Sequence, residues 1–145
     1  MLKTASKLIR HYETRDPFAI ARQRRIIVIE EPLGSIRGYY SRSYRQQFIH
    51  INNGLTEPQR LFTCAHELGH AILHPKANTP FLRKNTLLSV DRYEIEANRF
   101  AVCLLIDDEE LREYGDFTIP QLARAFGVSE ELIEYRLKAG RTFHK

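Results

Sequence analysis

The residues most able to do chemistry are two histidines and a glutamate in the segment His66-Glu67-Leu68-Gly69-His70. Histidines four residues apart on a helix project from one face, so both imidazoles can bind a single Zn²⁺. Glu67 lies beside them and can act as general base on a water molecule without binding the ion. With six His and thirteen Glu in 145 residues, a shuffled chain contains this pattern ~0.02 times. The pattern therefore predicts zinc ligands and a catalytic carboxylate; the alternative is an exposed polar helix face.

A catalytic zinc site needs a third protein ligand, and the predicted helix over about Asp91–Ile106 offers Glu94 and Glu96. The face that carries Glu94 otherwise holds Ala97, Asn98 and Ala101. Such a face of small residues can approach the histidine helix closely. Glu96 lies on another side of the helix, beside Arg99, where a surface ion pair is the simpler interpretation. Glu94 is favoured as the ligand, and a capping interaction with Asp91 is its alternative role.

Two further residues near the motif are not expected to bind the ion. His74 continues the four-residue spacing, but three ligands in line on one helix do not surround a single ion. We interpret His74 as a helix-end histidine favoured by the helix dipole. Cys64 lies too close to His66, on the wrong face. It could pair with Cys103, although two cysteines do not make a disulfide framework.

The surrounding sequence predicts an α+β fold. Three β-branched or aromatic runs, at 25–30, 36–41 and 46–51, predict a small antiparallel sheet. Further helices are expected near residues 2–12 and 17–24. Thr56 with Gln59 three residues later predicts a capping box at the start of the histidine helix, which should end near Leu73, before Pro75.

The end of the sequence predicts a helical tail, residues 111–145, packed on a peptidase core of residues 1–110 within a single structural domain. After an acidic turn at 107–110, helices over about 119–126 and 130–139 joined at Gly127 follow a helix-turn-helix pattern. Three acidic residues would repel DNA phosphates from the start of the second helix: Glu130, Glu131 and Glu134. DNA binding is therefore not expected, and a role in packing or substrate docking is favoured.

Composition narrows the class of protein. At 17.0 kDa, with 43% hydrophobic and 28% charged residues, the sequence is typical of one globular domain. Its longest apolar run, residues 100–106, is too short to span a membrane, and no signal peptide is recognisable, which predicts a cytoplasmic protein. Residues 1–25 carry a net charge of +5 and the remainder −1, a bias for which solvated helix faces are the favoured explanation.

Four groups of motifs together resemble the ImmA/IrrE family of zinc metallopeptidases, over about residues 5–138. They are Asp16-Pro17-Phe18 with Ala21; Gly38-Tyr39-Tyr40; Ala65 to His70 with Leu73-His74; and Glu94 to Ala101 with Leu104-Leu105. The resemblance implies that His66, His70 and Glu94 bind zinc, with Asn98 four residues after the glutamate. One departure is Asp107, where family members often have proline, at a position remote from these ligands.

The resemblance also implies the substrate, a helix-turn-helix repressor that guards a phage or another mobile element. Cleavage of that repressor would release transcription. From the residues alone, the alternatives are a non-proteolytic regulator that sequesters a repressor and one that binds DNA. The second donor that stabilises the oxyanion stays open among Tyr39, Tyr40, His50 and Tyr93.

Overall fold

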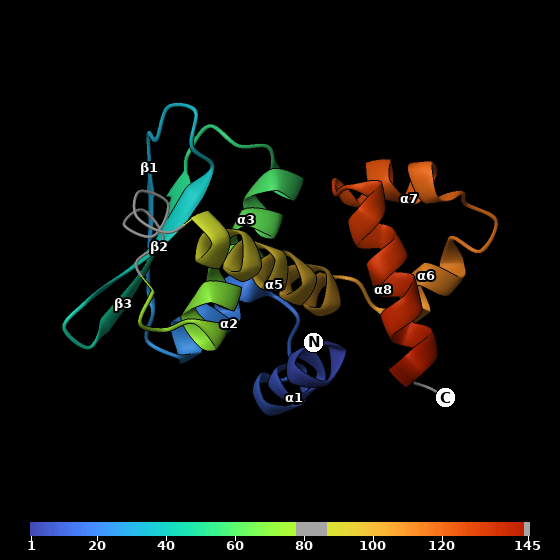
Figure 1. The fold of residues 1–145 in the computed structure, drawn as a ribbon, viewed down its shortest axis with the longest axis horizontal. Coiled ribbons are helices and arrows are strands. Elements are labelled where there is room, and N and C mark those ends of the chain that lie inside the picture. The colour runs from blue at the N-terminus through green and yellow to red at the C-terminus, as the bar shows by residue number, and fades with distance from the viewer. Residues whose placement is uncertain (78–86, 144–145) are drawn as a thin grey trace.

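The computed structural model describes residues 1–77 and 87–143, with side chains for 1–77 and 92–141. The loop predicted through Pro80 and Asn85 lies outside the described residues. The elements are α1 (Leu2–Tyr12), α2 (Pro17–Gln23), β1 (Ile27–Glu31), β2 (Gly38–Ser43), β3 (Gln46–Asn52), α3 (Glu57–Leu73), α5 (Leu87–Leu105), α6 (Asp108–Glu113), α7 (Ile119–Phe126) and α8 (Glu130–Phe143). The sheet and helices α6–α8 lie at opposite ends of the molecule, with α3 and α5 between them (Figure 1). The predicted α+β class is confirmed.

The prediction of a wholly antiparallel sheet is wrong. Strand β3 lies in the centre, in the order β1-β3-β2, and it is antiparallel to β2 but parallel to β1. The connection from β1 to β2 crosses the end of the central strand, where Asn52 is hydrogen-bonded to it. The side-chain amide of Asn52 donates to the carbonyls of Gly34 and Ile36, and its backbone N–H donates to Arg37. Alternation of apolar residues predicts strands but not their pairing order.

The core places the histidine helix between the sheet and α5. Ile49 and Ile51 of β3 and Leu68 of α3 are fully buried in one cluster. Helix α5 packs closely on α3 at Gly69, where an added Cβ would lie 3.0 Å from Cδ1 of Phe100 and 3.3 Å from Cα of Ala97. The predicted close approach of the small-residue face to the histidine helix is confirmed at this glycine. It fixes the spacing of the two helices, because any side chain at position 69 would separate them.

Helices α6–α8 pack on the C-terminal part of α5 through a second apolar cluster that includes Val102, Ile106 and Ile133. Arg136 of α8 is buried and donates from Nη2 to the carbonyl of Ile106 and to Oδ1 of Asp108, at 2.9 and 2.7 Å. These hydrogen bonds satisfy a carbonyl at the end of α5 that the helix itself leaves without a donor.

Two predicted boundaries in this region are wrong. The acidic segment after α5 is a helix, α6, because acidic residues in a first turn are stabilised by the helix dipole. Helix α8 continues past Ala139 to Phe143. Gly140 is tolerated there because Arg136 and Asp108 fill the space beside it.

Two further sequence expectations can be compared with the structure. Cys64 and Cys103 are buried and not joined to each other. None of the described helices combines the length and the apolar character needed to cross a membrane.

Candidate metal centre

Helix α3 carries the motif and is held at both ends. The predicted capping box is confirmed, because Thr56 Oγ1 accepts from the backbone N–H of Gln59 and Gln59 Oε1 accepts from that of Thr56. His74 ends the helix, and its backbone N–H donates to the carbonyl of His70. A capped helix that is buried over its central turns holds its side chains in fixed rotamers.

The three motif residues converge at the middle of α3. The His66 and His70 rings lie 4.9 Å apart between centroids and meet edge to face. Glu67 is 3% exposed, and its Oε2 lies 4.0 Å from Nε2 of His66. Candidate ligand atoms of His66, Glu67 and His70 all lie within 4.8 Å of one another.

Glu94 of α5 completes the cluster from the opposite helix. Its Oε2 lies 2.9 Å from Nε2 of His66, and its Oε1 lies 2.9 Å from Nε2 of His70. The predicted helix start at Asp91 is wrong, because α5 begins at Leu87 and Asp91 lies inside it. Glu94 therefore does not lie in the first turn of a helix, and its alternative role as a capping partner of Asp91 is wrong.

These contacts shift the proton affinities of the cluster. Burial raises the pKa of Glu94, but its hydrogen bonds with the two histidines outweigh this effect and hold that pKa well below the ordinary value. Burial lowers the pKa of His66, and the opposing interactions with Glu94 and Glu67 bring it above the ordinary value. Burial together with the neighbouring imidazole of His66 leaves the pKa of His70 lowered.

The cluster is chemically suited to a zinc ion. Two carboxylate oxygens and two imidazole nitrogens face one another, and such electron-rich atoms stay close only with cations between them, either protons or a metal. Nitrogen and oxygen donors on tetrahedral zinc lie roughly 3.3 Å apart, close to the 2.9 Å separations seen here. His66, His70 and Glu94 thus fit Zn²⁺ with small side-chain adjustments.

A second row of side chains extends from His70 away from the cluster. Nδ1 of His70 lies 3.2 Å from Nδ1 of His74, and Nε2 of His74 lies 3.0 Å from Oε2 of Glu96. Arg92 donates to the other oxygen of Glu96 at 3.0 Å. With zinc on Nε2 of His70, Nδ1 of that ring would carry its proton and donate to Nδ1 of His74, whose Nε2–H would donate to Glu96.

The structure therefore corrects the interpretation of Glu96 and extends that of His74. Glu96 pairs with His74 and Arg92, whereas the guanidinium of Arg99 lies over the ring of Tyr135. The spacing of four residues from His70 placed His74 near the site. No sequence signal linked it to Glu96, because that contact depends on the packing of α3 against α5.

A cavity of about 230 Å³ opens beside the cluster. It is lined by Arg37, Phe62, Thr63, His66, Glu67, Glu94 and Asn98. The four candidates for a second oxyanion donor lie outside this lining. Tyr40 instead donates to the carbonyl of Pro75, Tyr39 stacks on His50, and Tyr93 packs against His74. The cation that reaches the cavity is Arg37, which the sequence did not single out because a lone arginine in a loop carries no pattern.

Gly38 sets the distance between the sheet and Glu67, and its replacement by alanine is expected to destabilise the protein. A Cβ there would lie 2.6 Å from the carbonyl oxygen of His50 and 2.7 Å from Cγ2 of Thr63. Strand β2 would have to move away from α3, at a cost of about 1–3 kcal/mol. Urea unfolding measures this cost. Gly54→Ala is the control, because its Cβ would make only an ordinary 3.5 Å contact, and equal stability of the two variants would contradict the prediction.

The chain is similar to known proteins in sequence and in fold. A model of the Peptidase_M78 family, described as the IrrE N-terminal-like domain, matches residues 21–138. The chain is 45% identical over 136 residues to "Uncharacterized immunity region protein 2" of Bacillus phage phi105, covering 91% of this chain and 86% of that protein. It is 30% identical over 136 residues to "Metallopeptidase ImmA" of Bacillus subtilis (strain 168), covering 90% and 79%.

A solved structure described as a Mycobacterium tuberculosis transcriptional regulator has a similar fold, with a TM-score of 0.59 at 18% identity. The match covers 94% of this chain but only 45% of that one. This likeness concerns the fold alone.

Proposed function

Because the chain belongs to the Peptidase_M78 family of the IrrE N-terminal-like domain, we propose that it is a zinc-dependent endopeptidase that cleaves a helix-turn-helix repressor of a phage or other mobile element in the cytoplasm. The observation that carries the proposal is the convergence of His66, His70 and Glu94 beside the buried carboxylate of Glu67, at an open cavity. The names of two relatives support the substrate class, since one is an immunity region protein and the other a metallopeptidase.

In this proposal, His66, His70 and Glu94 are the protein ligands of zinc. When bound, zinc would polarise the substrate carbonyl and lower the pKa of a water molecule. Glu67 accepts the proton of the attacking water and then delivers it to the nitrogen of the scissile peptide bond. Burial of Glu67 keeps its carboxylate oriented towards the cavity, next to His66.

Arg37 is proposed to bind the carbonyl oxygen on which negative charge develops. Its side chain lines the same cavity as His66, Glu67 and Glu94, and a cationic donor there would stabilise the developing negative charge. Arg37→Ala should lower kcat of the zinc-loaded protein by ~10²-fold and leave zinc content unchanged. Steady-state kinetics with Arg42→Ala as the control would detect this; equal kcat values in the two variants would exclude the role of Arg37.

His74 and Glu96 are proposed to position His70 for zinc. His74→Phe keeps a ring beside Tyr93 but loses both hydrogen bonds, and it should weaken zinc affinity ~10–100-fold. Competition with a chromophoric chelator measures the affinity. Lys76→Ala, two residues further along the chain, is the control. Unchanged affinity in His74→Phe would contradict the assignment.

The alternative function is regulation without cleavage, by sequestering the repressor or by binding DNA. The presence of Glu67 beside the histidines favours hydrolysis, since a structural zinc site does not need a general base. The zinc-loaded protein should be mixed with the repressor encoded beside it and analysed on a denaturing gel. Two fragments support the peptidase; an intact repressor in a stable complex supports sequestration.

A further inference from the structure

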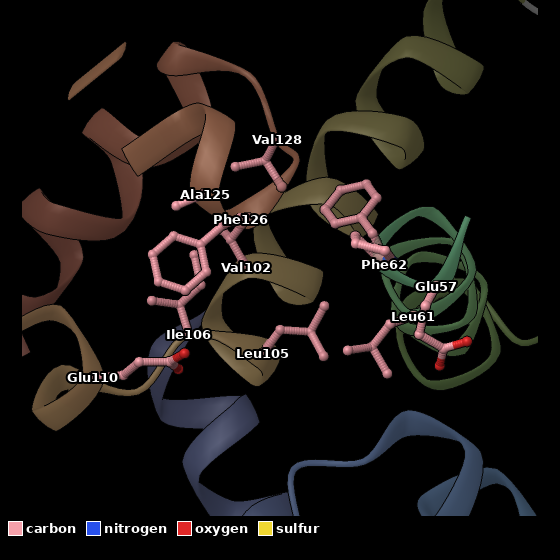
Figure 2. Close-up of a pocket in the computed structure, with 11 residues that line it drawn as sticks. Glu57, Leu61, Phe62, Val102, Leu105, Ile106, Glu110, Ala125, Phe126 and Val128 are labelled. Carbon is pink, nitrogen blue, oxygen red and sulfur yellow. The ribbon is translucent and has the colours of Figure 1, made fainter. Parts of the chain in front are cut away.

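A second cavity, of about 250 Å³, lies between α3, the end of α5 and the turn from α7 to α8. Figure 2 shows apolar side chains from these three places pointing into it. They include Leu61, Phe62, Val102, Leu105, Phe126 and Val128. We refer to this cavity as the interhelical pocket.

The interhelical pocket adjoins the candidate metal centre. Phe62 of α3 lines both cavities, and it stands one turn before His66. A polypeptide that places a peptide bond beside Glu67 therefore passes close to the interhelical pocket. This proximity relates the pocket to the substrate of the metal centre.

The rim and the surroundings of the pocket are acidic. Glu57 and Glu110 line it, at opposite ends of the row of apolar side chains in Figure 2. Residues 107–134, which supply α6, α7 and the start of α8, contain nine acidic and two basic residues, a net charge of −7. Two of the nine acidic residues pair with arginines from outside this segment, Asp107 with Arg15 and Asp108 with Arg136. Counting these two arginines still leaves a local charge of −5, in a chain whose net charge is +4. A partner that fits here carries apolar side chains close to lysine or arginine.

We propose that the interhelical pocket is a recognition site for an apolar segment of the protein substrate, flanked by lysine or arginine, next to the bond that is cut. This inference rests on the proposed function and deepens it. A repressor that binds DNA carries a basic surface for the phosphates, which is complementary to the acidic rim. The predicted helical tail then has a different use, because α7 and the turn that follows it form one wall of the substrate site.

The test is a binding measurement that does not depend on cleavage. A fluorescent amphipathic 18-residue peptide of leucine and lysine is titrated with the full-length Glu67→Gln protein, and fluorescence anisotropy gives Kd. The same peptide with glutamate in place of lysine should bind at least ~10-fold more weakly. Equal binding of the two peptides, or no binding of either, would overturn the proposal.

Variants locate the binding surface. Ala125→Phe fills the pocket from an exposed position and should weaken binding of the lysine peptide ~10-fold, whereas Ile27→Ser on the sheet should not. Glu57→Lys with Glu110→Lys should remove the preference for lysine over glutamate. Asp116→Lys, in the same acidic segment but outside the pocket lining, is the charge control. If Ala125→Phe binds the lysine peptide with the same Kd as wild type, the attraction is electrostatic only and the proposed recognition pocket is wrong.

Cleavage separates failure of this inference from failure of the proposed function. If wild type cuts the repressor and the double variant at Glu57 and Glu110 cuts it with the same kcat/KM, the pocket proposal is wrong and the peptidase proposal stands. If the repressor is never cut but the peptide preferences are as expected, the pocket stands as a binding site and the peptidase proposal is wrong.

Sedimentation of the protein alone should give a monomer. A dimer that Ala125→Phe abolishes would assign the pocket to a second copy of the chain and overturn the proposal.

Discussion

Glu67→Gln is expected to bind zinc like wild type and to cleave its substrate ~10²–10⁴ times more slowly. Glutamine keeps the size of the side chain and an oxygen that accepts hydrogen bonds, but it does not take up the proton of the attacking water. Because Glu67 is buried beside His66 and is not among the proposed zinc ligands, the ion should stay in place. Metal analysis and single-turnover cleavage of the repressor measure the two effects separately.

The same substitution separates proteolysis from its alternatives in cells. A module that sequesters a repressor or binds DNA would not respond to the loss of a general base. Derepression of a reporter should therefore disappear in Glu67→Gln at equal protein levels. Full derepression in that variant would mean that cleavage is not the physiological act.

Glu94→Ala is expected to lose stoichiometric zinc, whereas Glu96→Ala should keep it with weaker affinity. Removal of Glu94 takes away the group that lies against Nε2 of both histidines, and it leaves two ligands where a catalytic site needs three. Removal of Glu96 affects the ion only through His74 and His70. Zinc content after dialysis, measured for both variants and wild type, distinguishes the two glutamates.

Zinc retained in Glu94→Ala and lost in Glu96→Ala would move the third ligand to Glu96.

The pH dependence of zinc binding gives an independent check on the same site. The pKa of His66 is raised in the metal-free protein, so protons should compete with zinc at that imidazole from a higher pH than for an ordinary histidine. Zinc affinity should therefore fall as the pH is lowered through that range, and a flat profile between pH ~8 and ~6 would contradict the assignment of His66.

Local patterns predicted the parts of the site that one helix determines. The spacing of His66 and His70 placed both on one face, and Thr56 with Gln59 marked where that helix begins. The small residues of α5 correctly indicated that Glu94 faces α3, since the close approach at Gly69 and Ala97 brings the two helices together.

Features that depend on pairing between distant segments were not predictable in this way. The parallel pairing of β1 with β3 requires the connection between the first two strands to cross the end of β3, where Asn52 is hydrogen-bonded to it. The contact of His74 with Glu96, and the entry of Arg37 into the cavity, arise only when helices and sheet have packed. Single residues without a periodic pattern carry no such information in the sequence.

The most direct test of the account is mass spectrometry of the neighbouring repressor after incubation with the zinc-loaded protein, with and without a chelator. Hydrolysis of one peptide bond requires two fragments whose masses sum to that of the repressor plus one water. We expect these fragments with zinc, and none with chelator or with Glu67→Gln. An intact repressor in the presence of zinc, or fragments that persist with both the chelator and Glu67→Gln, would contradict the assignment of a zinc endopeptidase.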